Sequence, residues 1–274
     1  MMTIEEKFQE LNGIGEGAYM PHIYYGDPSE EFSLRQVETL VESGADMIEF
    51  GIPFSDPTAD GPAFQEACER ALKKGVTPER CIRGLEELRA GGVEVPIVVT
   101  TYYNIPYVYG IRDFLEKLEE AGVQGIIVPN LTIEEAEDFL KVSRKTGIDL
   151  IFQITPNTTV GRMERIVESA SGFIYIVNFE GVTGVRGAVA DSTKNLIGEV
   201  KTLTELPLMA GFGVSKREHA ASLVSAGADG VITGSALGEI YMKNLENPEG
   251  TLPEIGDFAS GIKRGCREGY SSRD

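Results

Sequence analysis

One acidic residue lies where the surrounding sequence predicts an apolar side chain. The apolar run 47–50 (Met-Ile-Glu-Phe) is typical of a short buried strand, and Glu49 is in its middle. A carboxylate buried among apolar side chains costs several kcal/mol unless it is paired, hydrogen-bonded or neutralised. Such a group has a raised pKa, which suits a general acid or base. We therefore interpret Glu49 as a catalytic acid/base, with a structural ion pair to an Arg or Lys as the alternative.

The loop after this strand carries further carboxylates. It runs through Gly51 and Pro53 and contains Asp56 and Asp60. Because the loop can fold back, Asp60 can lie over Glu49. We expect two carboxylates at the end of the strand, in different surroundings that separate their pKa values.

The rest of the chain repeats one unit: an amphipathic helix, a glycine that ends it, and a short apolar strand. The unit recurs at 41–51, 118–129 and 223–234, and the glycine suits the left-handed position after a helix. The apolar tetrads lack alternation, as in parallel strands covered on both faces. Eight strands are predicted, at 18–25, 47–50, 97–101, 125–128, 150–154, 173–177, 208–211 and 230–233.

Eight alternating strand–helix units predict a single (β/α)8 barrel, or TIM barrel, over residues 1–274. An extra N-terminal helix is expected at 4–11, and two inserted helices, at 62–74 and 78–89, follow the second strand. No linker or composition break marks a second domain. A flavodoxin-like open sheet is the alternative architecture.

Two glycine-rich loops follow the last two predicted strands, where barrels of this kind often bind phosphate. They contain Gly213 and the pair Gly234-Ser235, and a short helix is predicted to begin at Ser235. Backbone N–H groups in such loops, with the positive end of a helix dipole, can hold an anion. The loop 178–191 could add Gly184. We interpret this loop as a lid, the alternative being an ordinary surface loop.

The composition limits the classes of function. A net charge of −18 and a pI near 4.6 argue against binding to nucleic acid or to an anionic membrane surface. No apolar run approaches the roughly 20 residues that span a bilayer, and no signal peptide is visible. Three dispersed cysteines and two histidines argue against disulfides and a metal site, and indicate a reducing cytoplasm.

Further motifs extend along nearly the whole chain. The most specific is the block 49–62, Glu-Phe-Gly-Ile-Pro-Phe-Ser-Asp-Pro-Thr-Ala-Asp-Gly-Pro. The others are Tyr-Gly-Asp-Pro at 25–28, Gly-Val-Thr-Pro at 75–78, Tyr-Tyr-Asn at 102–104, Ile-Val-Pro at 127–129, Gly-Phe-Ile-Tyr at 172–175, Gly-Val-Thr-Gly at 181–184, Gly-Phe-Gly at 211–213 and Gly-Ser at 234–235. Together these motifs resemble the tryptophan synthase alpha subunit family.

The resemblance implies retro-aldol cleavage of indole-3-glycerol phosphate to indole and glyceraldehyde 3-phosphate, with no metal or organic cofactor. Glu49 would be the acid/base, Asp60 would accept a hydrogen bond from the indole N–H, and Tyr175 would line the site near Glu49. The remaining implied residues are, for the phosphate, Gly184, Gly213, Gly234 and Ser235; for the indole pocket, Phe64, Ile127, Phe212, His22 and Thr100; and for the lid, Thr183.

The resemblance also implies a partner, a pyridoxal-phosphate-dependent beta subunit that receives indole in an alpha2beta2 assembly. The loop 53–60 and the aromatic segment 102–106 would form part of the contact. Packing at the end of the barrel explains the aromatic segment equally well.

Some residues depart from the family pattern. His22 stands where the family usually has an aromatic residue such as Phe, and Thr100 where an aliphatic residue is usual. Together they make the expected pocket more polar. We interpret His22 as a hydrogen-bonded barrel histidine rather than as a new catalytic base. Asn130 stands where the family commonly has Asp.

Three alternative functions keep parts of this site. The chain could be a free-standing indole-3-glycerol-phosphate lyase, which the sequence does not separate from a synthase subunit. It could be a catalytically weak regulatory subunit of a beta partner, although a binding module has no reason to keep the buried Glu49. It could also be another phosphate-handling barrel enzyme, although the families of such enzymes do not contain the block 49–62.

Overall fold

The computed structural model describes residues 1–177, 191–211 and 213–273. Within them, nine parallel strands form one sheet. The strands are β1 Ala18–Tyr24, β2 Ile48–Gly51, β3 Ile97–Thr100, β4 Gly125–Ile127, β5 Asp149–Ile151, β6 Gln153–Ile154, β7 Ile174–Val177, β8 Leu208–Gly211 and β9 Gly230–Thr233.

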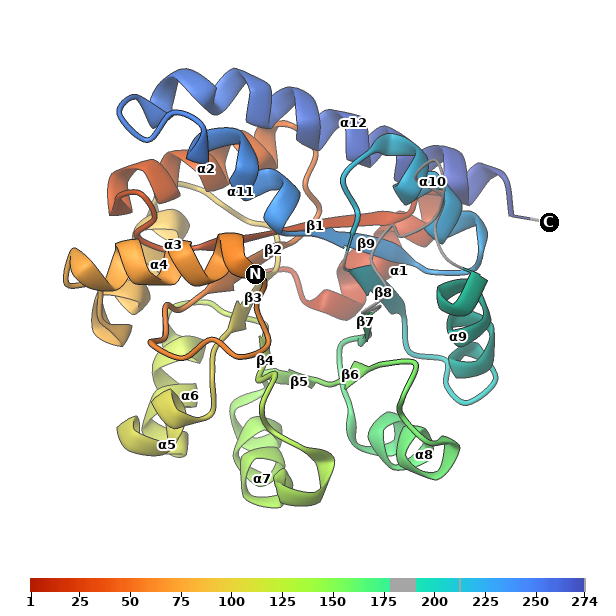
Figure 1. The fold of residues 1–274 in the computed structure, drawn as a ribbon. Coiled ribbons are helices and arrows are strands. Elements are labelled where there is room, and N and C mark those ends of the chain that lie inside the picture. The colour runs from red at the N-terminus through yellow and green to blue at the C-terminus, as the bar shows by residue number, and fades with distance from the viewer. Residues whose placement is uncertain (178–190, 212, 274) are drawn as a thin grey trace.

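The sheet closes into a barrel. The strand order is β5-β4-β3-β2-β1-β9-β8-β7-β6, so the first and last strands, β5 and β6, are consecutive in the chain. Only Phe152 separates them, and the helices surround the strands in a ring (Figure 1). The predicted (β/α)8 barrel is confirmed, and the open-sheet alternative is excluded because the two ends of the sheet meet.

The predicted strand 150–154 differs from the observed one, since it is divided into β5 and β6. The first half pairs with β4 and the second with β7, so this segment joins the two halves of the barrel. The other seven strands occur within one to two residues of their expected positions.

Helices follow the strands in chain order. They are α1 Ile4–Ile14, α2 Glu30–Glu42, α3 Pro62–Lys73, α4 Pro78–Ala90, α5 Asn104–Tyr109, α6 Ile111–Glu120, α7 Glu137–Thr146, α8 Val160–Ser169, α9 Asp191–Lys201, α10 Arg217–Ser225, α11 Ser235–Met242 and α12 Leu252–Ser271, with 3-10 turns at Ile133–Glu135 and Pro248–Thr251. The extra N-terminal helix, the two helices after β2 and the helix beginning at Ser235 are confirmed. None of the helices in these ranges is long and apolar enough to cross a membrane.

The barrel interior is apolar below the level of Glu49. Met20 on β1 and Met47, directly before β2, are buried there, and Val98 on β3 is buried beside Glu49, its register partner. Helix α1 adds Ile4 and Phe8 to the same cluster. The inward positions therefore change from apolar to polar only near the C-terminal ends of the strands, which places all the chemistry at that end.

The long helix α12 packs closely on α10, which follows the β8 loop. A Cβ at Gly265 would overlap the carbonyl oxygen of Arg217 and would lie 3.0 Å from the Ala220 methyl group. A Cβ at Gly269 would lie 2.5 Å from the carbonyl oxygen of Ala221. The two glycines lack a side chain where α12 contacts α10, and this lets the backbones of the two helices approach each other.

We predict that Gly265→Ala destabilises the protein, whereas Gly261→Ala in the same helix does not. Overpacking at Gly265 should lower the free energy of unfolding by about 1–3 kcal/mol. Gly261 has nothing within 4 Å of an added Cβ, so alanine there should raise it by up to about 1 kcal/mol through helix propensity. Urea unfolding of the two variants measures both changes, and equal effects would contradict the close packing.

Candidate active site

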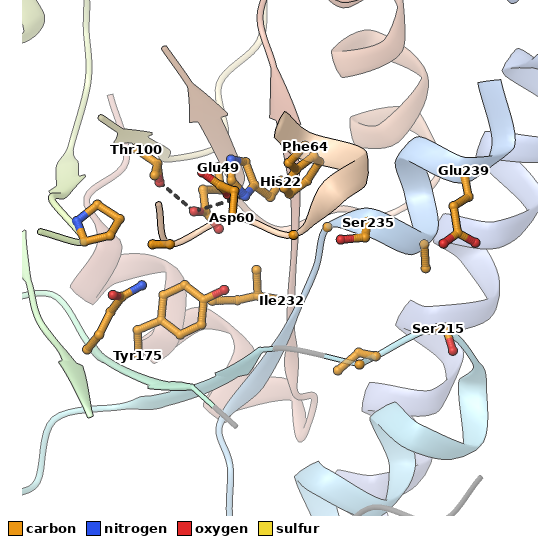
Figure 2. Close-up of a pocket in the computed structure, with 18 residues that line it drawn as sticks. His22, Glu49, Asp60, Phe64, Thr100, Tyr175, Ser215, Ile232, Ser235 and Glu239 are labelled. Atoms are coloured by element: carbon orange, nitrogen blue, oxygen red, sulfur yellow. Dashed lines mark hydrogen bonds and ion pairs between the residues drawn. The ribbon is translucent and has the colours of Figure 1, made fainter. Parts of the chain in front are cut away.

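A cavity of about 350 Å³ opens at the C-terminal ends of the strands. It brings together residues from β1, β2, β3, β7 and β9 and from the loops that follow β2 and β8 (Figure 2). Its lining comprises His22, Glu49, Ala59, Asp60, Gly61, Phe64, Thr100, Pro129, Gln153, Tyr175, Gly213, Val214, Ser215, Ile232, Gly234, Ser235, Ala236 and Glu239. No Lys or Arg side chain is among these residues.

The strand register places three polar side chains together. His22 on β1 pairs with Glu49 on β2, and Glu49 pairs with Val98 on β3. Thr100 lies two residues beyond Val98 and therefore points to the same inner face, diagonally above Glu49. Neither His22 nor Thr100 is close to Glu49 in sequence, so only the parallel pairing of three strands joins them.

Glu49 is buried, with an exposed fraction of 2%, and its two carboxyl oxygens differ. The Thr100 hydroxyl donates a hydrogen bond of 2.5 Å to Oε1, and His22 Nδ1 lies 3.4 Å from the same oxygen. The other oxygen, Oε2, has no hydrogen-bond partner in the described part of the chain. Burial raises the pKa of Glu49 to about 8, against the Thr100 hydrogen bond, which lowers it, while Asp60 adds a smaller upward effect. Glu49 is therefore protonated at neutral pH.

His22 is neutral in this site. Burial lowers the pKa of its imidazole to about 3. The ring lies against the aromatic rings of Tyr24 and Phe64, with centroid distances of 5.0 and 4.6 Å. A Cβ on Gly51 would lie 2.9 Å from its Nε2, so a glycine there leaves room for the ring. His22 thus contributes a neutral polar wall next to Glu49.

Asp60, on the loop after β2, lies over the same cavity. Its Oδ2 accepts hydrogen bonds from two phenols, from Tyr24 at 2.8 Å and from Tyr102 at 2.6 Å. Burial raises the pKa of Asp60, and the two phenol hydrogen bonds oppose that shift. The loop after β2 therefore folds back as the sequence suggested, and Asp60 and Glu49 line the same cavity. Tyr24 was not singled out by the sequence analysis, although its inward register on β1 two residues after His22 could have identified it.

Tyr175 and Gln153 form the opposite wall. They are register partners on β7 and β6, and both line the cavity. The Tyr175 ring lies over Gly211, where a Cβ would be 2.5 Å from the ring. Burial raises the pKa of Tyr175 well above its usual value, with Glu49 and Asp60 adding to the shift, so the phenol keeps its proton. Gln153 was not recognised from the sequence, in which 150–154 was predicted as a single strand.

The far end of the cavity is built from backbone. Gly213 has a φ of +73°, a left-handed conformation that favours glycine, and His219 Nδ1 lies 3.1 Å from its carbonyl oxygen. A Cβ on Gly234 would lie 2.7 Å from the Phe64 ring, and Gly234 is followed by the first turn of α11. The first N–H groups of a helix have no partner within the helix, so this end can accept an anion.

One carboxylate lies near this anion-accepting end. Glu239, one turn into α11 after Ser235, lines the cavity and is exposed (Figure 2). It was not recognised from the sequence, where it is one acidic residue of many. Its charge opposes the binding of an anion at long range and is screened by salt.

Not every expected site residue lines the cavity. Ile127 is buried in the barrel interior, where its register partner is Thr100, and it is not among the lining residues. The expected residues Gly184, Thr183 and Phe212, and the lid 178–191 apart from its last residue, lie outside the described residues. Among the described residues, no group of three or more His, Cys, Asp or Glu side chains is arranged to hold a metal ion.

The fold and the site define a class of protein. A buried acid that is neutral at pH 7, a second carboxylate held by phenols and an anion-accepting glycine end characterise a barrel enzyme that moves protons on a phosphorylated substrate.

The comparisons with known proteins specify the family. A family model described as "Tryptophan synthase alpha chain" matches residues 8–266. The tryptophan synthase alpha chain of Methanosarcina acetivorans is 44% identical over 262 residues, 96% of this chain and 93% of that protein. The solved alpha subunit structure from Legionella pneumophila superposes with a TM-score of 0.89 at 33% identity, covering 97% and 98% of the two chains. A chain of tryptophan synthase from M. tuberculosis gives a TM-score of 0.86 at 31% identity, covering 97% and 100%.

The chain belongs to the tryptophan synthase alpha chain family, as its motifs indicated. The reaction of this family is the cleavage of indole-3-glycerol phosphate, a carbon–carbon lyase reaction in tryptophan biosynthesis.

Burial of Glu49 predicts a pH-dependent gain of stability in Glu49→Gln. The folded pKa of about 8 lies above the ordinary value of 4.5, so the folded state binds the proton more tightly than the unfolded state. The resulting stabilisation is present below pH 4.5 and is lost as the pH rises through 8. Glutamine, which is neutral at all pH values, should therefore make the protein more stable than wild type by about 2–4 kcal/mol at pH 7–8.

Urea unfolding of both proteins between pH 5 and pH 8 measures this difference. It should shrink toward pH 5. A difference that does not change with pH would contradict the assignment of a protonated Glu49.

Proposed function

We propose that this chain cleaves indole-3-glycerol phosphate with Glu49 as the acid/base. The observation that carries the proposal is a buried carboxyl group with a raised pKa, one oxygen of which has no partner among the described residues. It lines a cavity that ends at the first turn of a helix, where an anion can bind. A group with a pKa near the working pH can both donate and accept a proton within one catalytic cycle.

The proton balance of the reaction needs only this one group. Glu49 donates its proton to C3 of the indole, which leaves a carboxylate and a cationic ring. The carboxylate then takes the proton of the adjacent glycerol hydroxyl. As that O–H bond breaks, a carbonyl forms, the carbon–carbon bond to C3 breaks, and its electron pair returns to the ring. The products are indole and glyceraldehyde 3-phosphate, and Glu49 is again protonated.

Asp60 would stabilise the cationic ring by accepting a hydrogen bond from the indole N–H. Its position supports this role because the phenols of Tyr24 and Tyr102 hold one of its oxygens and thereby fix the carboxylate over the cavity. Tyr175 would pack against the substrate opposite Glu49. Phe64 would contact the indole from the side of α3.

Gly184, Gly213, Gly234 and Ser235 would hold the phosphate. Thr183 on the lid would contact Asp60 when the lid is closed. Phe212 remains a predicted contact of the indole, whereas Ile127 is not among the described residues that line the cavity. The support for the phosphate end is the left-handed Gly213, the free first turn of α11 and the Gly234 position against Phe64. Because the described part of the lining contains no Lys or Arg side chain, backbone N–H groups would carry the binding.

A beta subunit would cover the barrel end beside the site. Tyr107 and Val108 on α5 are 68% and 85% exposed, which is unusual for large apolar side chains. Val108 lines a surface pocket together with Phe54 and Tyr109. The two explanations of the aromatic segment both have support, since Tyr102 is buried against Asp60 whereas Tyr107 faces outward.

An alpha2beta2 assembly with a pyridoxal-phosphate-dependent beta subunit, in the cytoplasm, is the arrangement that we propose. The three cysteines are free and buried, as expected for a reducing compartment.

The first test follows indole release from indole-3-glycerol phosphate, by the purified chain alone and with a cognate beta subunit. Wild type should release indole slowly alone and faster with the partner. Glu49→Gln, which keeps the size and hydrogen bonds of Glu49 but not its proton, should lose activity by roughly 100-fold or more. Circular dichroism of the variant provides the folding control.

The outcomes separate the alternatives. Fast release that no partner accelerates would favour a free-standing lyase. Activity that survives in Glu49→Gln would exclude Glu49 as the acid/base. Absence of indole release under both conditions would leave a regulatory subunit or another phosphorylated ligand.

A second prediction concerns Glu239. Its carboxylate lies at the phosphate end, so Glu239→Gln should lower the KM for the phosphorylated substrate by roughly 2- to 5-fold at low salt. The kcat should stay unchanged because the residue is distant from Glu49. Steady-state kinetics at about 0.02 and 0.5 M salt measure the effect, which should vanish at the higher ionic strength. An unchanged KM at low salt would place the phosphate elsewhere.

A further inference from the structure

We propose that Thr100 is a positioning residue for Glu49, which with His22 fixes Oε1 so that Oε2 exchanges the proton with the substrate. The inference rests on the proposed function of Glu49 and adds to it which of the two oxygens reacts, and what holds it in place.

The two oxygens of Glu49 have different surroundings. Oε1 accepts the 2.5 Å hydrogen bond from the Thr100 hydroxyl, and Thr100 itself is buried. Oε2 is equally buried but has no partner in the described part of the chain. A buried polar atom without a partner is rare in folded proteins, and Glu49 lines the cavity, so we infer that a ligand bound there supplies the missing contact. Figure 2 shows Thr100 and His22 approaching Glu49 together.

Among the described residues, no other side chain donates a hydrogen bond to Glu49. The inward side chains around and below it, such as Met20, Met47 and Val98, are apolar. A carboxyl group that rotates downward would lose its hydrogen bond and gain none, which is costly in a dry interior. Within the described residues, the hydrogen bond from the Thr100 hydroxyl therefore holds the carboxyl group at the level of the cavity.

His22 limits the movement of the carboxyl group on the side of β1. Its ring is confined by Tyr24, Phe64 and the bare backbone of Gly51, and its Nδ1 is 3.4 Å from Oε1. Because burial keeps the imidazole neutral, it adds no charge that would ionise Glu49. A phenylalanine would fill the same space without a polar atom facing Oε1.

The hydrogen bond also bears on where the proton resides. With the Thr100 hydroxyl as the donor, Oε1 is the carbonyl oxygen of the neutral acid, and we assign the acidic proton to the other oxygen, Oε2. After proton transfer, the Thr100 bond stabilises the carboxylate and lowers the pKa of Glu49, against burial and Asp60, which raise it. The other titratable groups that face Glu49 are His22 and Tyr175, and both are neutral.

The test compares Thr100→Val with Thr100→Ser. Valine keeps the shape of threonine without its hydroxyl, and serine keeps the hydroxyl. We expect Thr100→Val to lower kcat by roughly 10- to 100-fold with a KM changed by less than about 3-fold. The alkaline limb of the kcat/KM profile, set by loss of the Glu49 proton, should move to higher pH. Thr100→Ser should restore most of the rate and the wild-type profile.

Thr101→Val is the matched control. Thr101 is the next residue, equally buried, and its hydroxyl has no partner in the described part of the chain, so its loss should leave kcat and the pH profile as in wild type. Equal losses in Thr100→Val and Thr101→Val would overturn the proposal. So would a Thr100→Val variant that raises KM alone and keeps the wild-type pH profile, since that is the result of altered packing only.

A measurement without substrate separates this inference from the proposed function. Infrared difference spectra against Glu49→Gln isolate the C=O stretch of the protonated Glu49. Thr100→Val should shift that band to higher frequency, because the carbonyl oxygen loses its hydrogen bond, whereas Thr101→Val should not. An unchanged band overturns the role of Thr100 whether or not indole is released. Loss of indole release in wild type overturns the proposed function even if the band shifts.

Discussion

The burial of Glu49 is the constraint on which the rest of the site depends. A carboxyl group above an apolar barrel interior is stable when it is neutral, and burial raises its pKa to about 8. A pKa raised toward neutrality suits the proposed role, in which one group donates and then recovers a proton. The same burial destabilises the protein as the pH rises, which is the general trade between stability and activity at catalytic positions.

The two carboxylates of the site are held in similar ways. Glu49 receives one hydroxyl on Oε1, and Asp60 receives two phenols on Oδ2. Hydroxyl donors orient a carboxylate without adding a formal charge. Burial therefore remains the largest effect on the pKa values of both carboxyl groups. The absence of Lys and Arg from the described lining fits this arrangement, because a nearby cation would ionise Glu49 and remove its proton.

The barrel connects this chemistry to its surroundings. Parallel pairing of β1, β2 and β3 brings His22, Glu49 and Thr100 together, and the loops after β8 and β9 place glycine backbone at the opposite end of one cavity. Helix α5 presents Tyr107 and Val108 outward, while the neighbouring Tyr102 reaches Asp60.

The sequence by itself determined the features that are encoded locally. Strand and helix alternation predicted the barrel, one carboxylate in an apolar tetrad identified Glu49, and glycines after the last strands located the anion-accepting end. Tertiary structure decided which residues meet. The partners of Glu49 and Asp60, the entry of Gln153 and Glu239 into the lining, and the division of the strand at Phe152 depend on register between segments distant in the chain. Local pattern carries no information about register, because many pairings bury the same apolar residues.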